Sequence, residues 1–208
     1  MTADTPEITI VPANQASCED LQAVFGERGQ ATDCQCQRYR LAPNEAFSKF
    51  PRTERVRRLT EQTECGNPAS PTTSGLVAYL DAEPVGWCAV ERRTAYTGLV
   101  RVYRVPWTGR SEDKTDDTVW AVTCLFTRAG YRKQGVSYAL ARAAVDFARQ
   151  RSARALEAYP MITASGQDVT WGEHSVGTVG AFAAAGLEEV IRPTPRRVVM
   201  RIDFANSD

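Results

Sequence analysis

The residues with the clearest chemical potential form a short basic loop that runs from Thr127 to Ser137. A bound diphosphate needs several backbone N–H groups that converge on it, residues small enough for the backbone to approach, and the positive end of a helix dipole behind them. Gly135 and Ser137 are small, and Arg132 and Lys133 add positive charge. The loop therefore predicts a site that holds a pyrophosphate at the N-terminus of a helix.

Other phosphate-binding loops fit the same residues less well. A Walker loop ends in Gly-Lys-Ser or Gly-Lys-Thr, whereas Gly135 is followed by Val136 and Ser137. The dinucleotide fingerprint Gly-x-Gly-x-x-Gly is absent as well. The simplest alternative is a basic surface turn that precedes an ordinary helix.

Two strong patterns flank the loop and must position it. The run VWAVTCLF at 119–126 is almost uniformly apolar, which predicts a strand buried on both faces of a sheet. After Gly135, apolar residues recur at helical spacing, which predicts an amphipathic helix. Weaker patterns predict strands at 7–11, 76–80, 85–91, 155–161, 189–192 and 198–202, helices at 17–25 and 178–185, and a broken helical region at 43–63. This mixture predicts an α/β fold of the α+β kind.

Length and charge describe an ordinary globular chain. The 208 residues suffice for one substantial core and include no obvious spacer, so we expect a single domain over 1–208. With 25 Lys+Arg against 25 Asp+Glu, nucleic acid is not an expected partner. The sequence shows no export signal and no apolar run of about 18 residues, so we expect no membrane partner either.

The six cysteines show no paired C-x-x-C spacing and are too few for a disulfide scaffold. They favour a reduced, cytoplasmic protein. Cys34 and Cys36 could form half of a zinc site, but tetrahedral zinc needs four ligands and no second cluster is spaced to supply them. We therefore expect no metal.

The loop resembles the acyl-CoA signature of the GCN5-related N-acetyltransferase (GNAT) superfamily, Q/R-x-x-G-x-G/A, which RKQGVS at 132–137 follows except at its last position, where Ser137 replaces the usual Gly or Ala. The resemblance extends to EPVGW at 83–87, similar to the hairpin of the second and third strands, and to Tyr-Pro at 159–160 after the fifth. It also includes FAAAGL at 182–187, similar to a Y-x-x-x-G-F segment. It implies a GNAT-like fold, a central mixed and mostly antiparallel sheet with splayed fourth and fifth strands, flanked by helices.

The resemblance also implies where acetyl-CoA, the expected co-substrate, binds. The thioester lies in the gap between the fourth and fifth strands, where backbone groups of Leu125, Phe126 and Thr127 hold the acetyl carbonyl and the pantetheine arm. The N–H of Leu125 is the expected oxyanion donor. The signature loop holds the pyrophosphate with Arg132, Lys133, Gln134, Gly135, Val136 and Ser137.

The reaction implied by the resemblance is direct attack of a primary amine on the thioester within a ternary complex. The fourth strand carries no carboxylate, so Glu157 and the pair at 173–174 are the candidate bases, although each also reads as an ordinary polar residue. Phe182 stands where many family members place a tyrosine that protonates the leaving thiolate. Water or another hydroxyl, such as that of Tyr159 or Tyr138, is therefore the expected proton donor, or the thiolate leaves unassisted.

The acceptor side is less defined. The resemblance places the segment after the first helix at the acceptor cleft, so Gln35, Gln37, Arg38 and Tyr39 are candidates for selecting an acceptor, either a small molecule or a protein lysine. Cys124 beside the thioester reads either as a ping-pong nucleophile or as a small buried apolar residue. The resemblance leaves a homodimer open.

The sequence is compatible with two functions. The first is an N-acetyltransferase that uses acetyl-CoA. The second is a non-catalytic acyl-CoA-binding or interaction module, which Phe182 and the missing carboxylate on the central strand favour.

Overall fold

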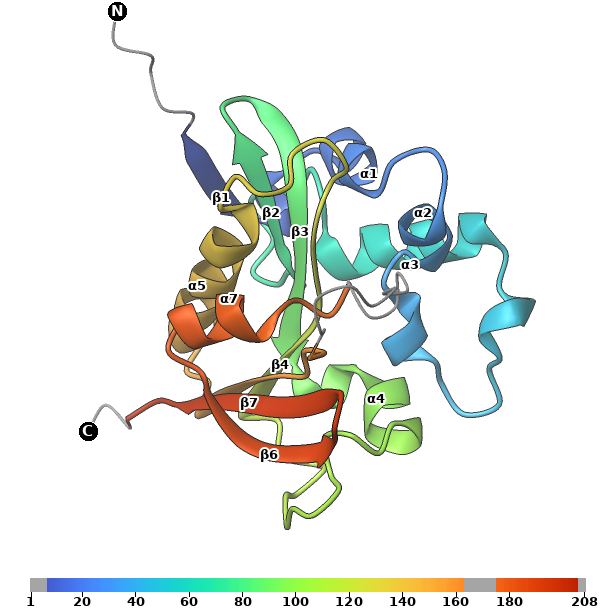
Figure 1. Ribbon diagram of the computed structural model, residues 1–208. Helices are drawn as coiled ribbons and strands as arrows, with labels where there is room; N and C mark the ends of the chain where they lie inside the picture. The colour runs from blue at the N-terminus through green and yellow to red at the C-terminus, as the bar shows by residue number, and fades with distance from the viewer. Residues whose placement is uncertain (1–6, 163–174, 206–208) are drawn as a thin grey trace, which may run out of the picture.

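A seven-stranded sheet forms the centre of the computed structural model, which describes residues 7–162 and 175–205 (Figure 1). In chain order the strands are β1 (Ile8–Pro12), β2 (Leu76–Leu80), β3 (Glu83–Arg92), β4 (Val119–Thr127), β5 (Ala155–Ala158), β6 (Glu188–Thr194) and β7 (Arg197–Asp203). Their spatial order is β1-β2-β3-β4-β5-β7-β6. Among these strands, β4 and β5 pair in parallel and every other neighbouring pair is antiparallel. The predicted mixed, mostly antiparallel sheet is confirmed.

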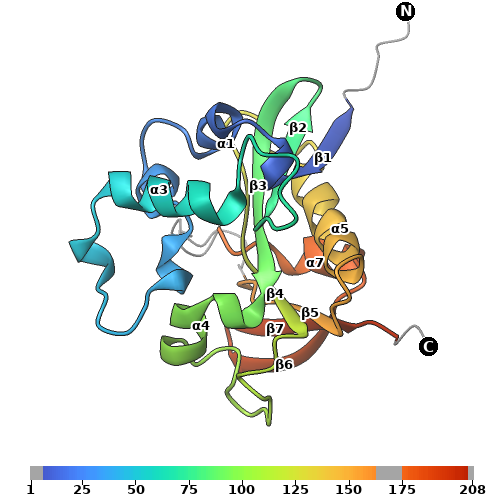
Figure 2. The same ribbon diagram turned by 180° about the vertical axis from the view of Figure 1, so that it is seen from behind.

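Helices cover both faces of the sheet. Figures 1 and 2 show α5 (Val136–Arg149) and α7 (Val179–Ala184) on one side. The other side carries α1 (Cys18–Phe25), α2 (Gln30–Cys34), α3 (Arg52–Thr63) and α4 (Thr97–Val102), with short 3-10 helices η1 (Ala13–Gln15), η2 (Gln37–Arg40), η3 (Phe47–Lys49) and η4 (Arg93–Ala95) in the connections. The phosphate loop therefore enters a helix on one face, and α2 and η2 lie over the other.

The strongest sequence patterns, those of β4 and α5, fold as predicted. The first eight residues of β4 are buried, as an apolar run predicts for a central strand. The apolar stripe of α5 packs against β1 to β4. Gly86 of β3 permits this close packing, because a Cβ there would lie 2.8 Å from Val136 and 3.0 Å from Leu140. A larger residue would push α5, and the loop that precedes it, away from the sheet.

Other segments differ in part from the prediction. The break predicted at Pro51 is observed, since this residue separates η3 from α3. β5 ends at Ala158, short of the predicted 161. The sequence predicts no helix at α4, whose residues TGLVRV are mostly glycine and β-branched. Packing compensates for this weak propensity, because Gly98 lies so close to η2 that a Cβ there would be 3.0 Å from the carbonyl oxygen of Tyr39.

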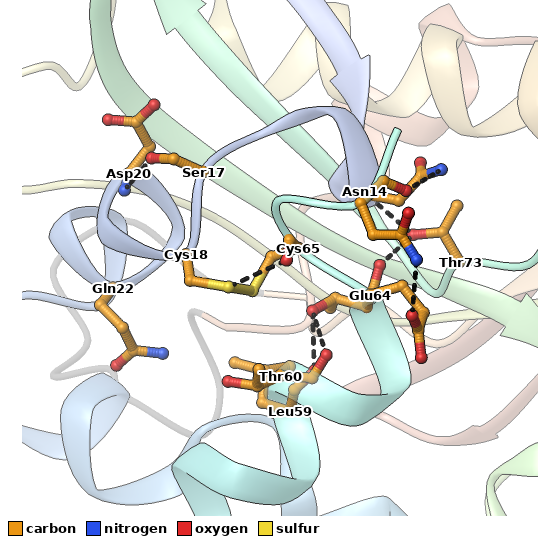
Figure 3. The surroundings of a disulfide bond; sticks show 12 residues. Asn14, Ser17, Cys18, Asp20, Gln22, Leu59, Thr60, Glu64, Cys65 and Thr73 are labelled. Atoms are coloured by element: carbon orange, nitrogen blue, oxygen red, sulfur yellow. Dashed lines mark hydrogen bonds between the residues drawn. A yellow bond between two sulfur atoms is a disulfide. The ribbon is translucent and has the colours of Figure 1, made fainter. Parts of the chain in front are cut away.

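A disulfide joins Cys18, the first residue of α1, to Cys65, which follows α3 (Figure 3). The prediction of reduced cysteines is therefore wrong for this pair. The two cysteines are 47 positions apart, so no local pattern links them, and the packing of α1 beside the end of α3 brings them together. Cys34, Cys36, Cys88 and Cys124 are free.

Within the described ranges, no helix combines the length and the apolar character that crossing a membrane requires.

Candidate functional site

The candidate site is built on β4, which changes its pairing along its length. From Trp120 to Val122 the strand pairs with both β3 and β5, and beyond Val122 the ladder with β5 stops. The register with β3 slips by one residue at this point, so Thr123 is an extra residue in β4. A bulge of this kind bends a strand and re-aims the residues beyond it. The second half of β4 thus diverges from β5, as the predicted splay requires.

Beyond the bulge, the N–H of Leu125 points into the gap between β4 and β5. It donates a hydrogen bond of 2.7 Å to the carbonyl oxygen of Ser175, and Leu125 forms a parallel bridge with Val176. The segment 175–178 therefore lies along β4 like an added strand. A thioester carbonyl bound to the N–H of Leu125 would have to replace the oxygen of Ser175.

A cavity of about 180 Å³, which we call the loop cavity, opens between this part of β4 and the predicted phosphate loop. Six of the predicted CoA-binding residues line it together with Gly177 and Thr178, namely Leu125, Phe126, Thr127, Arg132, Lys133 and Ser137. Residues from the end of the strand and from the loop thus meet at one cavity. The other three predicted residues, Gln134, Gly135 and Val136, belong to the same loop and the first turn of α5.

The loop delivers the start of α5 to this cavity. Gly135 is the N-cap of α5 with φ +84°, a left-handed conformation that favours glycine, and no side chain caps the helix. The N–H groups of the first turn are therefore free of a side-chain cap, and the helix dipole adds partial positive charge there. The side chain of Val136 is buried in the core, so its backbone is the part available to a ligand.

A second cavity, of about 230 Å³, adjoins the same strand. We call it the thiol cavity because Cys34, Cys36 and Cys124 line it, together with Gln30, Asp33, Arg38, Tyr39, Phe47 and Ser175. Cys124 and Ser175 border the thiol cavity, and the next residue of β4, Leu125, borders the loop cavity. The two cavities therefore approach each other at the N–H of Leu125.

Two thiols of this cavity, those of Cys34 and Cys36, are uncharged at neutral pH. Burial raises the pKa of Cys34, and it raises the pKa of Cys36 well above the usual value. The sulfur of Cys36 also accepts a hydrogen bond of 3.2 Å from the indole N–H of Trp87. These cysteines therefore act as small, weakly polar wall residues. In the described part of the chain, no three His, Cys, Asp or Glu side chains are arranged to hold a metal ion.

The four residues expected at the acceptor cleft separate into two pairs. Arg38 and Tyr39 line the thiol cavity. Gln35 and Gln37 do not line it, because their side chains are buried and bonded to other parts of the chain. Gln35 exchanges hydrogen bonds with Gln22 of α1, and Gln37 does so with Gln62 of α3. These two glutamines hold the wall in place rather than face a ligand.

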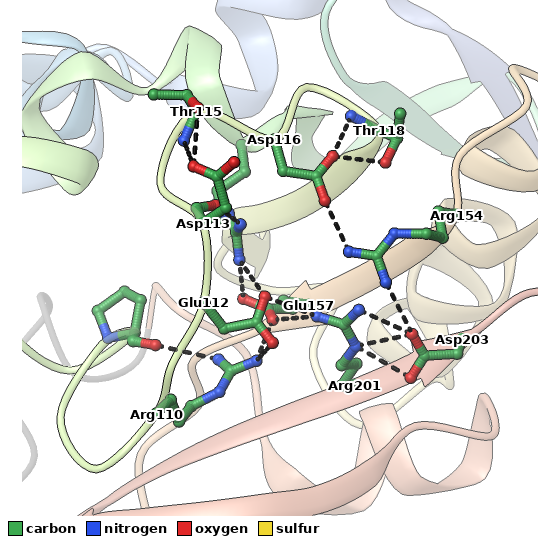
Figure 4. Close-up of polar contacts among 12 residues, drawn as sticks. Arg110, Glu112, Asp113, Thr115, Asp116, Thr118, Arg154, Glu157, Arg201 and Asp203 are labelled. Atoms are coloured by element: carbon green, nitrogen blue, oxygen red, sulfur yellow. Dashed lines mark hydrogen bonds and ion pairs between the residues drawn. The ribbon is translucent and has the colours of Figure 1, made fainter.

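Glu157, the predicted base, lies in a buried ion-pair cluster (Figure 4). Its Oε1 accepts hydrogen bonds from Arg110 and, at 2.7 Å, from Arg201, and its Oε2 pairs with Arg93 at 3.2 Å. Burial alone would raise the pKa of Glu157, but Arg110, Arg93 and the Tyr159 hydroxyl outweigh burial and lower it. A fully buried carboxylate with both oxygens occupied is poorly placed to take a proton.

The position of Glu157 in the sheet supports the same conclusion. It pairs with Ala121 of β4, four residues before Leu125, which corresponds to roughly 13 Å along a strand. Its side chain shares two arginine partners with a residue of the connection that precedes β4, since Glu112 also bonds to Arg93 and Arg201. The geometry therefore gives Glu157 a structural place and argues against the predicted base role.

The predicted proton donors are also engaged elsewhere. The hydroxyl of Tyr159 donates to Oε2 of Glu157 at 2.8 Å, and burial followed by the charge of Glu157 raises its pKa well above the usual value. Tyr138 is exposed, and its hydroxyl lies against Gly180 of α7. Phe182 is fully buried with its ring against Gly177. The remaining base candidates, at 173–174, lie outside the described residues.

Comparison with known proteins identifies the family. The sequence model described as "Acetyltransferase (GNAT) family" matches residues 38–165. The chain therefore belongs to the GNAT acetyltransferase family, which implies acyl-CoA-dependent acetyl transfer. No curated protein sequence matches it.

Solved structures with the same fold agree with this assignment. An N-acetyltransferase from Staphylococcus aureus Mu50 is 12% identical with a TM-score of 0.53, over 95% of this chain and 98% of that chain. A ribosomal-protein-alanine N-acetyltransferase from Brucella melitensis is 16% identical with a TM-score of 0.51, over 94% and 99%. The paiA N-acetyltransferase from Thermoplasma acidophilum in complex with coenzyme A is 12% identical with a TM-score of 0.50, over 95% and 99%. At these identities the likeness concerns the fold.

Proposed function

We propose that this chain is an N-acetyltransferase that moves the acetyl group of acetyl-CoA to a primary amine by direct attack in a ternary complex. The observation that carries the proposal is the position of the N–H of Leu125, at the splayed half of β4 where the loop cavity and the thiol cavity approach each other. The loop cavity would take the pyrophosphate and pantetheine of CoA. The thiol cavity would take the amine.

The chemistry follows from this arrangement. With the thioester carbonyl on the N–H of Leu125, the amine nitrogen attacks the carbonyl carbon and negative charge develops on the oxygen that Leu125 binds. A preorganised donor of this kind contributes on the order of 3 kcal/mol to lowering the barrier. The tetrahedral intermediate then releases the CoA thiolate. A thiol pKa of about 8.5 makes this a fair leaving group, so a dedicated acid is not essential.

The amine must lose a proton, because an alkyl amine with a pKa of about 10.4 is almost entirely protonated at neutral pH. We do not assign this step to Glu157 or Tyr159, since both are buried and bonded to each other. The thiol cavity is lined by one described carboxylate, that of Asp33. Transfer to solvent through this cavity is the route that the described residues favour.

The test is thiol release from acetyl-CoA with a panel of primary amines, with CoA binding measured by calorimetry in parallel. Release that depends on the amine supports the proposal. CoA binding without release on any amine would instead favour the acyl-CoA-binding module, which the burial of Phe182 and the occupied Glu157 also suggest.

Replacing Gly135 by valine is expected to weaken CoA binding by about tenfold or more. At φ +84° a β-branched residue is strained by roughly 1–2 kcal/mol, so the loop will rearrange and shift the N–H groups at the start of α5. Each tenfold loss of affinity corresponds to about 1.4 kcal/mol. Calorimetric titration with CoA measures the change.

Gly66→Val is the matched control for this experiment. Gly66 has φ +78° with no atom near its missing Cβ, and it follows α3 on the opposite side of the sheet from α5. Both variants carry the same backbone strain. Equal CoA affinities in the two variants would show that the backbone conformation of Gly135 does not contribute to CoA binding.

Replacing Cys124 by alanine should leave kcat within about threefold of the parent value, because direct attack needs no enzyme nucleophile. Cys124 lines the thiol cavity beside Leu125, which makes it the cysteine to test for a covalent route. Steady-state kinetics and mass spectrometry after incubation with acetyl-CoA alone provide the measurement. Loss of activity by a hundredfold, together with acetylation of Cys124 in the parent protein, would establish a ping-pong mechanism.

A further inference from the structure

The thiol cavity has uncharged and aromatic side chains in its wall. Burial raises the pKa of Cys34 and Cys36 on this wall, so these two thiols are uncharged, and Tyr39 and Phe47 add aromatic surface. A cavity of roughly 150 Å³ accommodates a benzene ring. The observed 230 Å³ therefore admits a group of that size and a few further atoms.

Positive charge gathers around the same cavity. The guanidinium of Arg38, which lines it, lies 4.8 Å from the centre of the Phe47 ring, and that of Arg55 lies 3.9 Å from the same ring. Arg197 lines a smaller neighbouring cavity together with Tyr39. Against these three guanidinium groups, the described lining of the thiol cavity offers the carboxylate of Asp33.

These arginines differ from others close by in having no ionic partner among residues 7–162 and 175–205. Within the described residues, no carboxylate oxygen lies within 4.0 Å of a nitrogen of Arg38, Arg55 or Arg197. By contrast, Arg58 of α3 pairs with Glu45 and Glu54. Because the whole chain has equal numbers of acidic and basic residues, the excess of positive charge is local to this cavity.

Arg55 and Arg38 have different roles in this arrangement. Arg55 is buried and donates to the backbone carbonyl oxygens of Asp33 and Phe47, so it holds the wall together. Arg38 is exposed to the cavity, and stacking on Phe47 orients its guanidinium. A planar guanidinium presents paired donors that match the two oxygens of a carboxylate.

We infer that the acceptor is a small primary amine that carries an oxyanion, such as a carboxylate, on an apolar body, and that Arg38 binds this oxyanion. The inference rests on the proposed function and names its substrate class. The apolar body lies against the thiols and Phe47, and the amine points toward Leu125. Polyamines and other polycations are poor acceptors, because the positive charge of Arg38 in the cavity, and of Arg55 behind its wall, would repel their additional ammonium groups.

Matched ligand pairs test this inference. Each pair shares its amine and its body and differs in the carboxylate, as in phenylalanine and 2-phenylethylamine, or leucine and 3-methylbutylamine. Binding to the CoA-loaded protein is measured by calorimetry, and thiol release from acetyl-CoA is measured separately. In at least one pair the acid should bind about 10- to 100-fold more tightly, as a charge-assisted hydrogen bond typically gives.

Arg38→Gln should abolish this preference by weakening binding of the acid about 10- to 100-fold while the matched amine binds as before. Arg142→Gln, which removes an exposed arginine from α5, is the control and should change neither ligand. Thermal melts establish that both variants are folded.

The outcomes separate the inference from the proposed function. Equal or tighter binding of the amines without a carboxylate in every pair, no binding in any pair, or a preference that survives Arg38→Gln would overturn the inference. Thiol release with amines that lack a carboxylate, and none with the acids, would overturn it while supporting acetyl transfer. Acid binding that depends on Arg38, without thiol release, would support the ligand class and refute the proposed function.

Discussion

The Glu157→Gln variant is expected to lose about 3 kcal/mol or more in its free energy of unfolding. Glu157 is fully buried and faces Arg93, Arg110 and Arg201, whose side chains are 0%, 9% and 7% exposed. Glutamine keeps the shape but removes the charge, so three buried guanidinium groups share a weaker acceptor. Urea denaturation at neutral pH measures the loss.

Glu189→Gln is the matched control, because it removes a carboxylate from an exposed ion pair. Glu189 of β6 bonds to Arg192, whose side chain is 51% exposed. Water screens such a pair, so the substitution should change stability little. If both variants lost the same free energy, burial would not explain the effect at Glu157.

The pH dependence of stability distinguishes the two variants further. The pKa of Glu157 is lowered in the folded protein, so its carboxylate stabilises the fold at pH values above the unfolded pKa of about 4.3. That contribution disappears as the pH falls through the lower, folded pKa. The stability difference between the parent protein and Glu157→Gln should therefore be constant near neutrality and shrink below about pH 4. A difference that grows on acidification would contradict the lowered pKa.

The same variant separates a structural role from the predicted catalytic one. If Glu157 holds the fold, Glu157→Gln assayed well below its melting temperature should keep most of its kcat. A folded variant with a kcat at least a hundredfold lower and an unchanged KM for both substrates would restore Glu157 as the base.

The parts of the fold that the sequence predicted are those with local patterns. β4 and α5 each carry one continuous signal, an apolar run and a helical stripe, and the loop between them carries its own chemistry. The splay between the fourth and fifth strands was predicted from the family resemblance and not from a local pattern. Its physical origin, the extra residue Thr123, leaves no mark in an apolar run, because a bulge is defined by the partner strand.

The parts of the site that escaped prediction depend on residues far apart in the chain. The thiol cavity combines α2, η2 and η3 with Cys124, some 90 residues later, and nothing in the C-x-C spacing of Cys34 and Cys36 indicates that third thiol. Glu157 was predicted as a free base because its three arginine partners are distant in the sequence, at positions 93, 110 and 201. The sequence indicates candidate side chains, and the packing determines which of them are free to react.

Removing the disulfide with Cys18→Ser and Cys65→Ser is expected to lower the free energy of unfolding by about 4 kcal/mol, the chain-entropy value for a loop of this length. A cross-link over 47 residues restricts the unfolded chain, and most of that restriction is lost in the double variant. Denaturation of the parent protein with and without reductant should show the same difference. The stability of the double variant should not change when reductant is added. Cys34→Ser, which leaves the disulfide intact, should respond to reductant as the parent protein does.

The location of the disulfide predicts which substrate its removal affects. The closed loop between Cys18 and Cys65 contains α2, η2 and η3, and so every described residue of the thiol cavity apart from Cys124 and Ser175. The loop cavity draws its described residues from β4, the phosphate loop and the 175–178 segment, all outside that span. Reduction should therefore raise the KM for the amine by severalfold while the Kd for CoA stays near its original value. A larger change in CoA binding than in amine KM would mean that the two cavities do not depend on separate parts of the chain.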